Sequence, residues 1–152
     1  MKTVANSIIT MTELVLPQHT NQLGNLLGGQ LMHWIDICAA LASSKHAAKV
    51  CVTASVDSID FHHPIKLGDV VTLMASVNRV FNSSMEVGVT VCAENHVLLN
   101  KRHTNSAYLT FVGLTPEGVP IKSDPITPET DDQKRRYDEA LIRRQKRLEN
   151  RD

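Results

Sequence analysis

The sequence predicts a fold of the α+β class, in which one long helix lies against an antiparallel sheet. An apolar segment from about residue 29 to residue 48 has the three- and four-residue spacing of a buried helix and contains no proline. Shorter segments rich in Val, Thr and Leu follow it and are separated by turn residues, as strands are. One helix and a run of strands together favour a layer of helix on one face of a sheet.

The first expected element is a strand over residues 7–16, which Pro17 ends. A polar, glycine-containing loop follows over residues 19–27, and the helix then begins near Gly29. Its apolar side is expected to consist of Leu31, Trp34, Ile35, Cys38, Leu41 and Ala42. Because alanine and other apolar residues fill about two turns, we expect this helix to be mostly buried.

Four further strands are expected after the helix, over residues 50–61, 70–80, 85–93 and 102–114. The first of these alternates in polarity, which predicts a shared face for Val50, Val52, Ala54 and Val56. Five strands on a single helix leave an exposed sheet edge and uncovered apolar surface. Edge-to-edge pairing into a dimer would cover both.

The chain of 152 residues is most simply one domain, over residues 1–115, followed by a C-terminal segment over residues 116–152. That segment begins with a proline-containing linker and continues as a helix from about residue 131 to residue 151. From Lys134 to Arg147 it carries seven basic and two acidic residues. A charged helix of this kind is most often solvated.

Composition excludes several classes of protein. The formal net charge is zero, so the chain as a whole is not an electrostatic binder of nucleic acid. Cys38, Cys51 and Cys92 are odd in number and widely spaced, which suggests neither a zinc site nor a disulfide framework. We expect no metal, no membrane span and a reducing, cytoplasmic location, because the sequence shows no ligand motif such as HExxH, no signal peptide and no run of ~20 apolar residues.

Asp36 is unusual because it lies in the apolar helix, between Ile35 and Ile37. A carboxylate there is costly to bury unless it is paired or used. The residues alone leave two interpretations open: a local pair with His33, or a functional role. The Gly28-Gly29 pair at the helix start is equally open, since it serves either tight packing or the approach of a ligand to the backbone.

Three motifs occur in order along the chain: Asn21-x-x-Gly24-x-x-x-Gly28-Gly29 leading to Asp36, Phe61-x-x-Pro64-Ile65-x-x-Gly68-Asp69, and Asn82-Ser83-Ser84-Met85-Glu86-Val87. Over residues 12–112 this pattern resembles the hotdog-fold acyl-CoA thioesterases. It is most similar to the bacterial short- and medium-chain acyl-CoA hydrolases and the cytosolic brain-type hydrolases of animals. The resemblance implies the hotdog fold and hydrolysis of fatty acyl-CoA without a cofactor, coenzyme A being part of the substrate.

The resemblance also implies site residues. Asp36 matches the catalytic acidic position, as general base or as nucleophile. The backbone N–H of Gly29 would hold the oxyanion, and the amide of Asn21 would orient the reactants. Gly28, Ser83, Ser84 and Arg79 are candidates for binding coenzyme A. For the basic C-terminal helix, contact with the CoA phosphates or subunit docking is an alternative to simple solvation.

Helix geometry restricts how these residues cooperate. Asp36 follows Gly29 by seven residues, so it lies about 10 Å further along the axis at ~1.5 Å per residue. One helix therefore cannot easily place both groups at one carbonyl. An antiparallel partner helix could, which predicts a site shared across a homodimer. The family resemblance implies such a dimer as the minimum active unit, commonly in a trimer of dimers.

Two other functions remain open. A non-catalytic acyl-CoA-binding module on the same fold would bind the ligand without releasing thiol. Another hotdog enzyme, such as a carrier-protein thioesterase or a hydratase, would use the same framework. A hydratase would be expected to show a catalytic histidine in the helix region, and His33 lies at the wrong place for it. The absence of a GxSxG motif argues against the α/β-hydrolase route to thioester cleavage.

Overall fold

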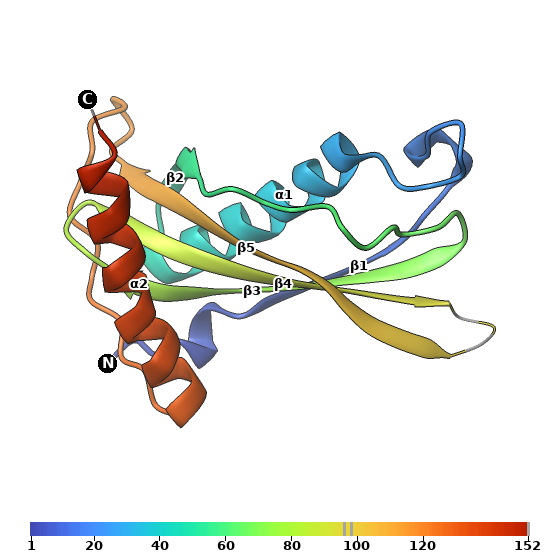
Figure 1. Ribbon diagram of the computed structural model, residues 1–152. Helices are drawn as coiled ribbons and strands as arrows, with labels where there is room; N and C mark the ends of the chain where they lie inside the picture. The colour runs from blue at the N-terminus through green and yellow to red at the C-terminus, as the bar shows by residue number, and fades with distance from the viewer. Residues whose placement is uncertain (96, 98, 152) are drawn as a thin grey trace.

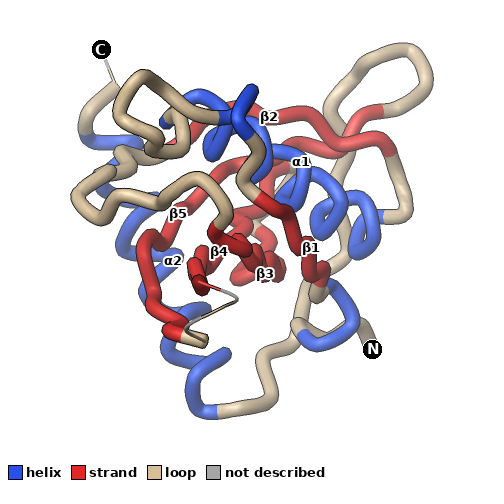
Figure 2. Tube along the Cα trace, turned by 90° about the vertical axis from the view of Figure 1, so that its right-hand side faces the viewer, coloured by secondary structure: helices blue, strands red, loops and turns tan. Residues whose placement is uncertain are grey.

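The computed structural model describes residues 1–95, 97 and 99–151. His96 and Leu98, within the predicted domain, and Asp152, at the end of the predicted C-terminal segment, lie outside the described residues. Figures 1 and 2 show a strongly curved sheet with one helix in its concave side and a second helix against the opposite side. The elements are 3-10 turns η1 (Ala5–Ser7) and η2 (Pro17–His19), strands β1 (Ile9–Leu14), β2 (Val50–Val56), β3 (Asp69–Val80), β4 (Ser84–Asn95) and β5 (Asn100–Leu114), and helices α1 (Gly28–Ala47) and α2 (Asp131–Glu149).

The described residues form a five-stranded sheet in the order β1-β3-β4-β5-β2, and every neighbouring pair is antiparallel. This confirms the predicted architecture, with β1 and β2 at the edges. Two strands are shorter than predicted. β1 starts at Ile9 because Ser7 lies in η1, where its hydroxyl donates to the Val4 carbonyl and accepts from the Val77 N–H. β2 ends at Val56, well before Phe61.

The core lies between α1 and the concave face of the sheet. Side chains of α1 that are at most 5% exposed include Leu31, Trp34, Ile35, Cys38, Ala39 and Ala42. They pack in one cluster with alternate residues of β3 and β4, among them Leu73 and Val91. The predicted apolar side is therefore confirmed except at Leu41, which is 48% exposed. The prediction fails there because α1 covers the sheet with one side only.

A β-bulge at Ala54 changes the faces of β2. Val52 is paired with Val112 and Thr53 with Phe111, but after the bulge Ser55 is paired with Thr110 and Val56 with Leu109. Phe111 and Leu109 are buried in the core, so Thr53 and Val56 both face α1. The prediction that Val50, Val52, Ala54 and Val56 share one face is therefore wrong, since the extra residue reverses the alternation.

Apolar side chains remain exposed where α1 runs beside the edge strand β2. They are Ile37 and Leu41 on α1 and Val50, Val52 and Val56 on β2. An edge strand with free backbone groups and exposed valines is a ready surface for pairing with another strand. This is the surface that the predicted dimer would cover.

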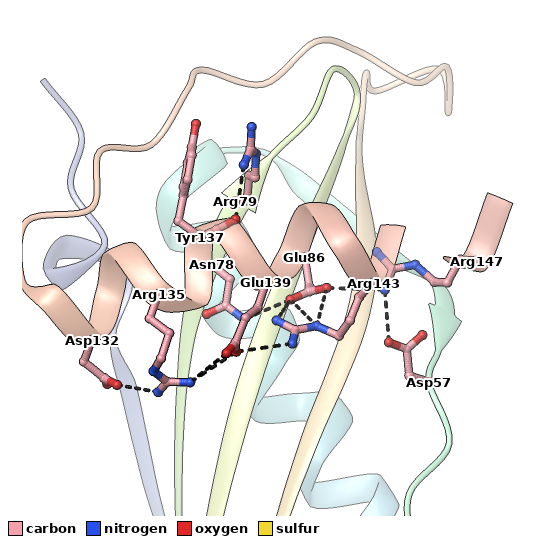
Figure 3. Close-up of polar contacts among 10 residues, drawn as sticks. All are labelled: Asp57, Asn78, Arg79, Glu86, Asp132, Arg135, Tyr137, Glu139, Arg143 and Arg147. Atoms are coloured by element: carbon pink, nitrogen blue, oxygen red, sulfur yellow. Dashed lines mark hydrogen bonds and ion pairs between the residues drawn. The ribbon is translucent and has the colours of Figure 1, made fainter. Parts of the chain in front are cut away.

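Helix α2 lies across the convex face of the sheet rather than being solvated on all sides (Figure 3). Its side chain Arg143 reaches Glu86 of β4, with 2.7 Å between Nη2 and Oε1, and stacks on the Tyr108 ring 3.7 Å from its centre. Burial lowers the pKa of Arg143, but its hydrogen bonds and ion pair with Glu86 outweigh this and hold the pKa above its usual value. The sheet therefore anchors the predicted basic helix.

Glu86 is fully buried and accepts from three side chains (Figure 3). Besides Arg143, these are Asn78, 3.0 Å away, and Arg147, 3.3 Å away. Arg147 also donates to Asp57. A Cβ added at Gly88 would lie 2.7 Å from the amide nitrogen of Asn78, closer than any real contact. A side chain at position 88 would therefore displace the Asn78 amide, which donates to Glu86.

No helix among the described residues is long and apolar enough to cross a membrane.

Candidate active site

Asp36 projects from α1 toward β2, where its Oδ1 accepts a hydrogen bond from the Thr53 hydroxyl at 2.7 Å. The carboxylate is half-buried, which spares it the cost of full burial and keeps it accessible to a ligand. His33 is exposed and forms no ion pair with Asp36 within the described residues. The local pairing with His33 is thus not what holds this carboxylate in place.

The start of α1 presents unpaired backbone donors. The first helical hydrogen bonds run from the N–H groups of Gln30 and Leu31 to the Leu27 carbonyl, so those of Gly28 and Gly29 precede the bonded part of the helix. The helix dipole makes this end mildly positive. Space is open at Gly29, where an added Cβ would meet nothing within 4 Å, while at Gly28 it would meet the Phe61 ring at 3.7 Å. Gly29 is the more approachable donor.

Asn21 lies in the loop before α1, as predicted, and its side chain is exposed. Its Oδ1 accepts from the backbone N–H groups of Leu23, at 2.9 Å, and Asn25, at 3.1 Å. The loop is tied down further by a 2.8 Å bond from Lys66 to the Asn25 side chain. Because the loop uses the oxygen of Asn21, the amide NH₂ remains as a donor.

A pocket of about 190 Å³ joins this loop to the helix start. Its lining includes Asn21, Gly28, Phe61, His63 and Asn105. Asn105 is only 6% exposed and donates to the Asp60 carbonyl. The pocket therefore combines amide and backbone donors with an aromatic wall, a setting suited to a polarised carbonyl.

The predicted catalytic residues fall into two groups. Asn21 borders the pocket at the start of α1, beside Gly28, which was predicted to bind CoA. Gly29 follows Gly28 in the first turn but is absent from the pocket lining, and so is Asp36. Because α1 is continuous from Gly28 to Ala47, Gly29 and Asp36 are separated by about 10 Å along its axis. One protomer therefore presents the donors and the carboxylate at separate places.

The candidate CoA-binding residues are also divided. Ser83 and Ser84 lie at the turn between β3 and β4, which the Phe81 N–H closes on the Ser84 carbonyl at 2.9 Å. Arg79 instead donates to the Tyr137 carbonyl of α2 and lies 4.0 Å from the centre of the Tyr137 ring (Figure 3). Arg79 thus holds α2 against the sheet.

Thr53 is the site residue that sequence reasoning missed. The expected alternation made β2 a strand with one apolar face and gave no reason to examine its other residues. A hydroxyl among valines on a strand adjacent to the helix bearing Asp36 is a weak signal. The bond from Thr53 to Asp36 becomes visible only with the register of β2.

Two other kinds of chemistry find little support. Cys38 is buried, and burial raises its thiol pKa to about 11, so it is a poor nucleophile near neutral pH. Among the described residues, no group of three or more His, Cys, Asp or Glu side chains could hold a metal ion.

The fold and these residues define a class of protein: a hotdog-type domain with backbone donors at the start of its long helix and a carboxylate further along it. Residues 23–99 match the thioesterase superfamily. The chain belongs to this superfamily.

Relatives of known name agree with this assignment. The chain is 44% identical over 140 residues to acyl-coenzyme A thioesterase 11 of Mus musculus, covering 92% of this chain but 23% of the mouse protein. It is 36% identical over 141 residues to YkhA of Bacillus subtilis, an uncharacterized acyl-CoA thioester hydrolase, covering 93% of this chain and 82% of that protein. The chain thus spans about a quarter of the mouse relative.

Solved structures confirm the hotdog fold. The acyl-CoA hydrolase of Staphylococcus aureus, solved with butyryl-CoA, CoA and CoA disulfide, superposes with a TM-score of 0.91 at 39% identity, covering 97% of this chain and 90% of that one. A hexameric acyl-CoA thioesterase superposes with a TM-score of 0.94 at 37% identity, covering 97% and 94%. The Staphylococcus enzyme was also solved as three variants, with an aspartate, an asparagine or a threonine replaced by alanine.

Proposed function

We propose that this chain hydrolyses fatty acyl-CoA to free fatty acid and CoA, with Asp36 as general base or nucleophile. The observation that carries this proposal is the half-buried Asp36 carboxylate, held by the Thr53 hydroxyl within a fold shared with acyl-CoA hydrolases. The hydrogen bond to Thr53 fixes the orientation of the carboxylate. A fixed and accessible carboxylate suits either proton abstraction from water or direct attack on a carbonyl.

The three variants of the Staphylococcus hydrolase support the assignment of residues. In that enzyme the asparagine precedes the aspartate by 15 positions, and the threonine follows the aspartate by 17. Asn21, Asp36 and Thr53 have the same spacings in this chain. Asn21 and Thr53 are therefore proposed to serve the same site as Asp36.

The proposed reaction places the thioester carbonyl at the Gly29 N–H, with the Asn21 amide as a second donor. As base, Asp36 takes a proton from water while the water oxygen bonds to the carbonyl carbon. The two donors stabilise the resulting oxyanion. The tetrahedral intermediate then expels the CoA thiolate as the carbon–sulfur bond breaks, and the thiolate takes the proton that Asp36 removed from water. As nucleophile, Asp36 would instead displace the thiolate and leave an acyl anhydride for water to hydrolyse.

A homodimer is proposed as the minimum active unit. The exposed apolar side chains on α1 and the free edge of β2 lie together, and a second copy would cover them. Antiparallel pairing of two α1 helices would bring Gly29 and Asn21 of one copy to Asp36 of the other. The hexameric relative supports a trimer of such dimers. The free cysteines Cys38, Cys51 and Cys92 support a reducing, cytoplasmic location.

A thiol-release assay tests the proposal directly. The purified chain is incubated with a series of acyl-CoAs from butyryl-CoA upward, and free CoA is measured with a chromogenic disulfide. Asp36→Ala should lower kcat about 10³-fold, in the range for loss of a general base, with unchanged melting temperature and CoA affinity. CoA binding without thiol release in the wild-type protein would identify a binding module instead, and full activity of Asp36→Ala would remove Asp36 from the reaction.

A further inference from the structure

The segment that joins β2 to β3 forms one wall of the pocket at the start of α1. It comprises residues 57–68, and in Figure 1 it is the green segment that runs alongside α1. We call it the β2–β3 loop. Its Phe61 is 52% exposed, yet the ring lies 3.7 Å from the place that a Cβ at Gly28 would take. The position of this loop therefore decides what surrounds the backbone donors of α1.

Few polar contacts hold the part of the β2–β3 loop that carries Phe61. Over residues 58–63, the only hydrogen bond to another part of the described chain runs from Nδ2 of Asn105 on β5 to the Asp60 carbonyl. Ile59 packs against the edge of the core just before this bond. Asn105 is therefore the polar anchor of the residue that immediately precedes Phe61.

A β-bulge in β5 directs a second side chain to the same loop. Arg102 donates to the Pro64 carbonyl at 3.1 Å. In a regular strand, residues 102 and 105 would face opposite sides of the sheet, because they are three positions apart. The bulge changes this, since Asn105 is paired with Val91 and Arg102 with Ala93, both buried in the core. Both side chains therefore lie on the concave side, where they hold the loop on either side of its aromatic ring.

Asn105 is an amide at a place where an apolar residue would continue the core. The next three residues on the same face of β5, Ala107, Leu109 and Phe111, are at most 1% exposed and belong to the core. Asn105 itself is only 6% exposed, and a polar side chain so deeply buried needs a partner, which the Asp60 carbonyl provides. An apolar side chain would need none. The amide at this position therefore serves the loop rather than the core.

The ring of Phe61 is important for the proposed reaction because it adjoins the oxyanion donors. It lies against Gly28, next to the open space at Gly29. A hydrogen bond to a developing oxyanion is stronger where water is excluded, since the local dielectric constant is lower. An aromatic wall at this place excludes water from one side of the donors and does not compete for their N–H groups.

We propose that Asn105 is a positioning residue for thioester hydrolysis, which holds Phe61 at the start of α1 so that the ring shields the oxyanion donors from water. This inference rests on the proposed function. Without the hydrogen bond to Asp60, the loop moves away from Gly28 more often and water reaches the donors. The effect falls on kcat rather than on KM, because these donors act on the charge that develops in the transition state.

A double-mutant cycle in the thiol-release assay tests this role. Asn105→Leu keeps the approximate size of the side chain but cannot donate, so it should lower kcat about tenfold and leave KM within about twofold of wild type. Phe61→Ala should lower kcat to a similar extent. The two substitutions together should be no worse than Phe61→Ala alone, because Asn105 acts only through the ring.

Ser106→Ala is the matched control for this cycle. Its hydroxyl is on the exposed side of the same strand, where it bonds to His103 at 3.0 Å, so its loss should leave kcat and KM unchanged. Losses in the double variant that multiply to about a hundredfold would show that Asn105 does not act through Phe61. A rise in KM without a fall in kcat would equally overturn the proposal.

Limited proteolysis reports the position of the loop without any activity. Asn105→Leu should raise the rate of chymotrypsin cleavage after Phe61 about tenfold, with the melting temperature near that of wild type, because only the loop is released. Asn105→Asp also lacks the donor and should do the same, which covers a failure of Asn105→Leu to fold. Unchanged cleavage in both variants would overturn the positioning role. If the wild-type protein releases no thiol, the proposed function fails, and the cleavage rates still show whether Asn105 holds the loop.

Discussion

At the start of α1, the N–H groups of Gly28 and Gly29 and the amide NH₂ of Asn21 have no hydrogen-bond partner among the described residues. Beneath α2, by contrast, the buried carboxylate of Glu86 is surrounded by Asn78, Arg143 and Arg147. Both regions concentrate polar groups next to the sheet. In one they are exposed and unpaired, and in the other they are buried and paired with one another.

The difference separates groups that can act on a ligand from groups that stabilise the fold. A donor already paired within the protein gains little from a ligand, whereas an unpaired donor at a helix start can bind a developing negative charge. A buried carboxylate, in turn, is tolerated only with partners. Substitutions at the start of α1 should therefore change activity more than stability, and substitutions beneath α2 should do the reverse.

Gly29→Pro should give the largest effect among substitutions at the start of α1. Proline is tolerated in the first turn of a helix, so the variant removes one N–H with little damage to α1. Loss of one oxyanion donor should lower kcat about 10²- to 10³-fold. Gly29→Ala keeps the N–H and has open space for its Cβ, so it should stay within a few-fold of wild type in the thiol-release assay. Equal activity of Gly29→Pro and Gly29→Ala would exclude this N–H as the oxyanion donor.

Complementation would show whether each site is shared between two copies. Gly29→Pro and Asp36→Ala chains are refolded together, and thiol release is compared with that of each variant alone. In a shared site, half of the dimers are mixed and each restores one of two sites, so activity should reach about a quarter of wild type. Sites contained within single chains would show no recovery at all.

Glu86→Gln tests the paired region. The substitution keeps the shape but removes the charge that Arg143 and Arg147 need, so we expect a loss of about 3 kcal/mol in the free energy of unfolding, measured by urea denaturation. Below the transition, kcat should remain near that of wild type. Arg135→Gln is a suitable control, because the ion pairs of Arg135 with Asp132 and Glu139 lie on the exposed side of α2. Their loss should leave the urea midpoint unchanged.

Thr53→Val should lower activity less than Gly29→Pro does. Valine matches threonine in shape but cannot donate to Asp36, so the carboxylate loses its fixed orientation and kcat should fall about tenfold. Thr53→Ser keeps the hydroxyl and should recover most of the rate. A rate for Thr53→Val equal to wild type would show that Asp36 acts without this bond.

The elements of the fold could be predicted because each has a local signal. The three- and four-residue spacing from Leu31 to Ala42 marks α1, and turn residues such as Asn82 separate the strands. The faces of β2 could not be predicted, because the bulge at Ala54 depends on pairing with β5, distant in sequence. The exposure of Leu41 likewise depends on how far the sheet curves around the helix.

The candidate site divides in the same way. Asn21, Gly29 and Asp36 stand out within one short stretch, where a carboxylate interrupts an apolar helix and two glycines open it. Thr53 becomes a partner of Asp36 only through the register of β2. The basic helix could be recognised from its charge, but only its docking shows that Arg143 and Arg147 face Glu86.

The network around Glu86 also limits which residue can occupy position 88, where the chain has a glycine. The hydrogen atom that serves as its side chain is what lets Asn78 reach Glu86, since a methyl group at that place would meet the Asn78 amide at 2.7 Å. Displacing Asn78 would remove a hydrogen-bond donor from Glu86. The contact of Glu86 with Arg143, which holds α2 against the sheet, would then be weaker. Position 88 has no charge, touches no proposed substrate and lies in the middle of a strand. Even so, a side chain at this position would weaken the contacts that hold α2 against the sheet in this chain.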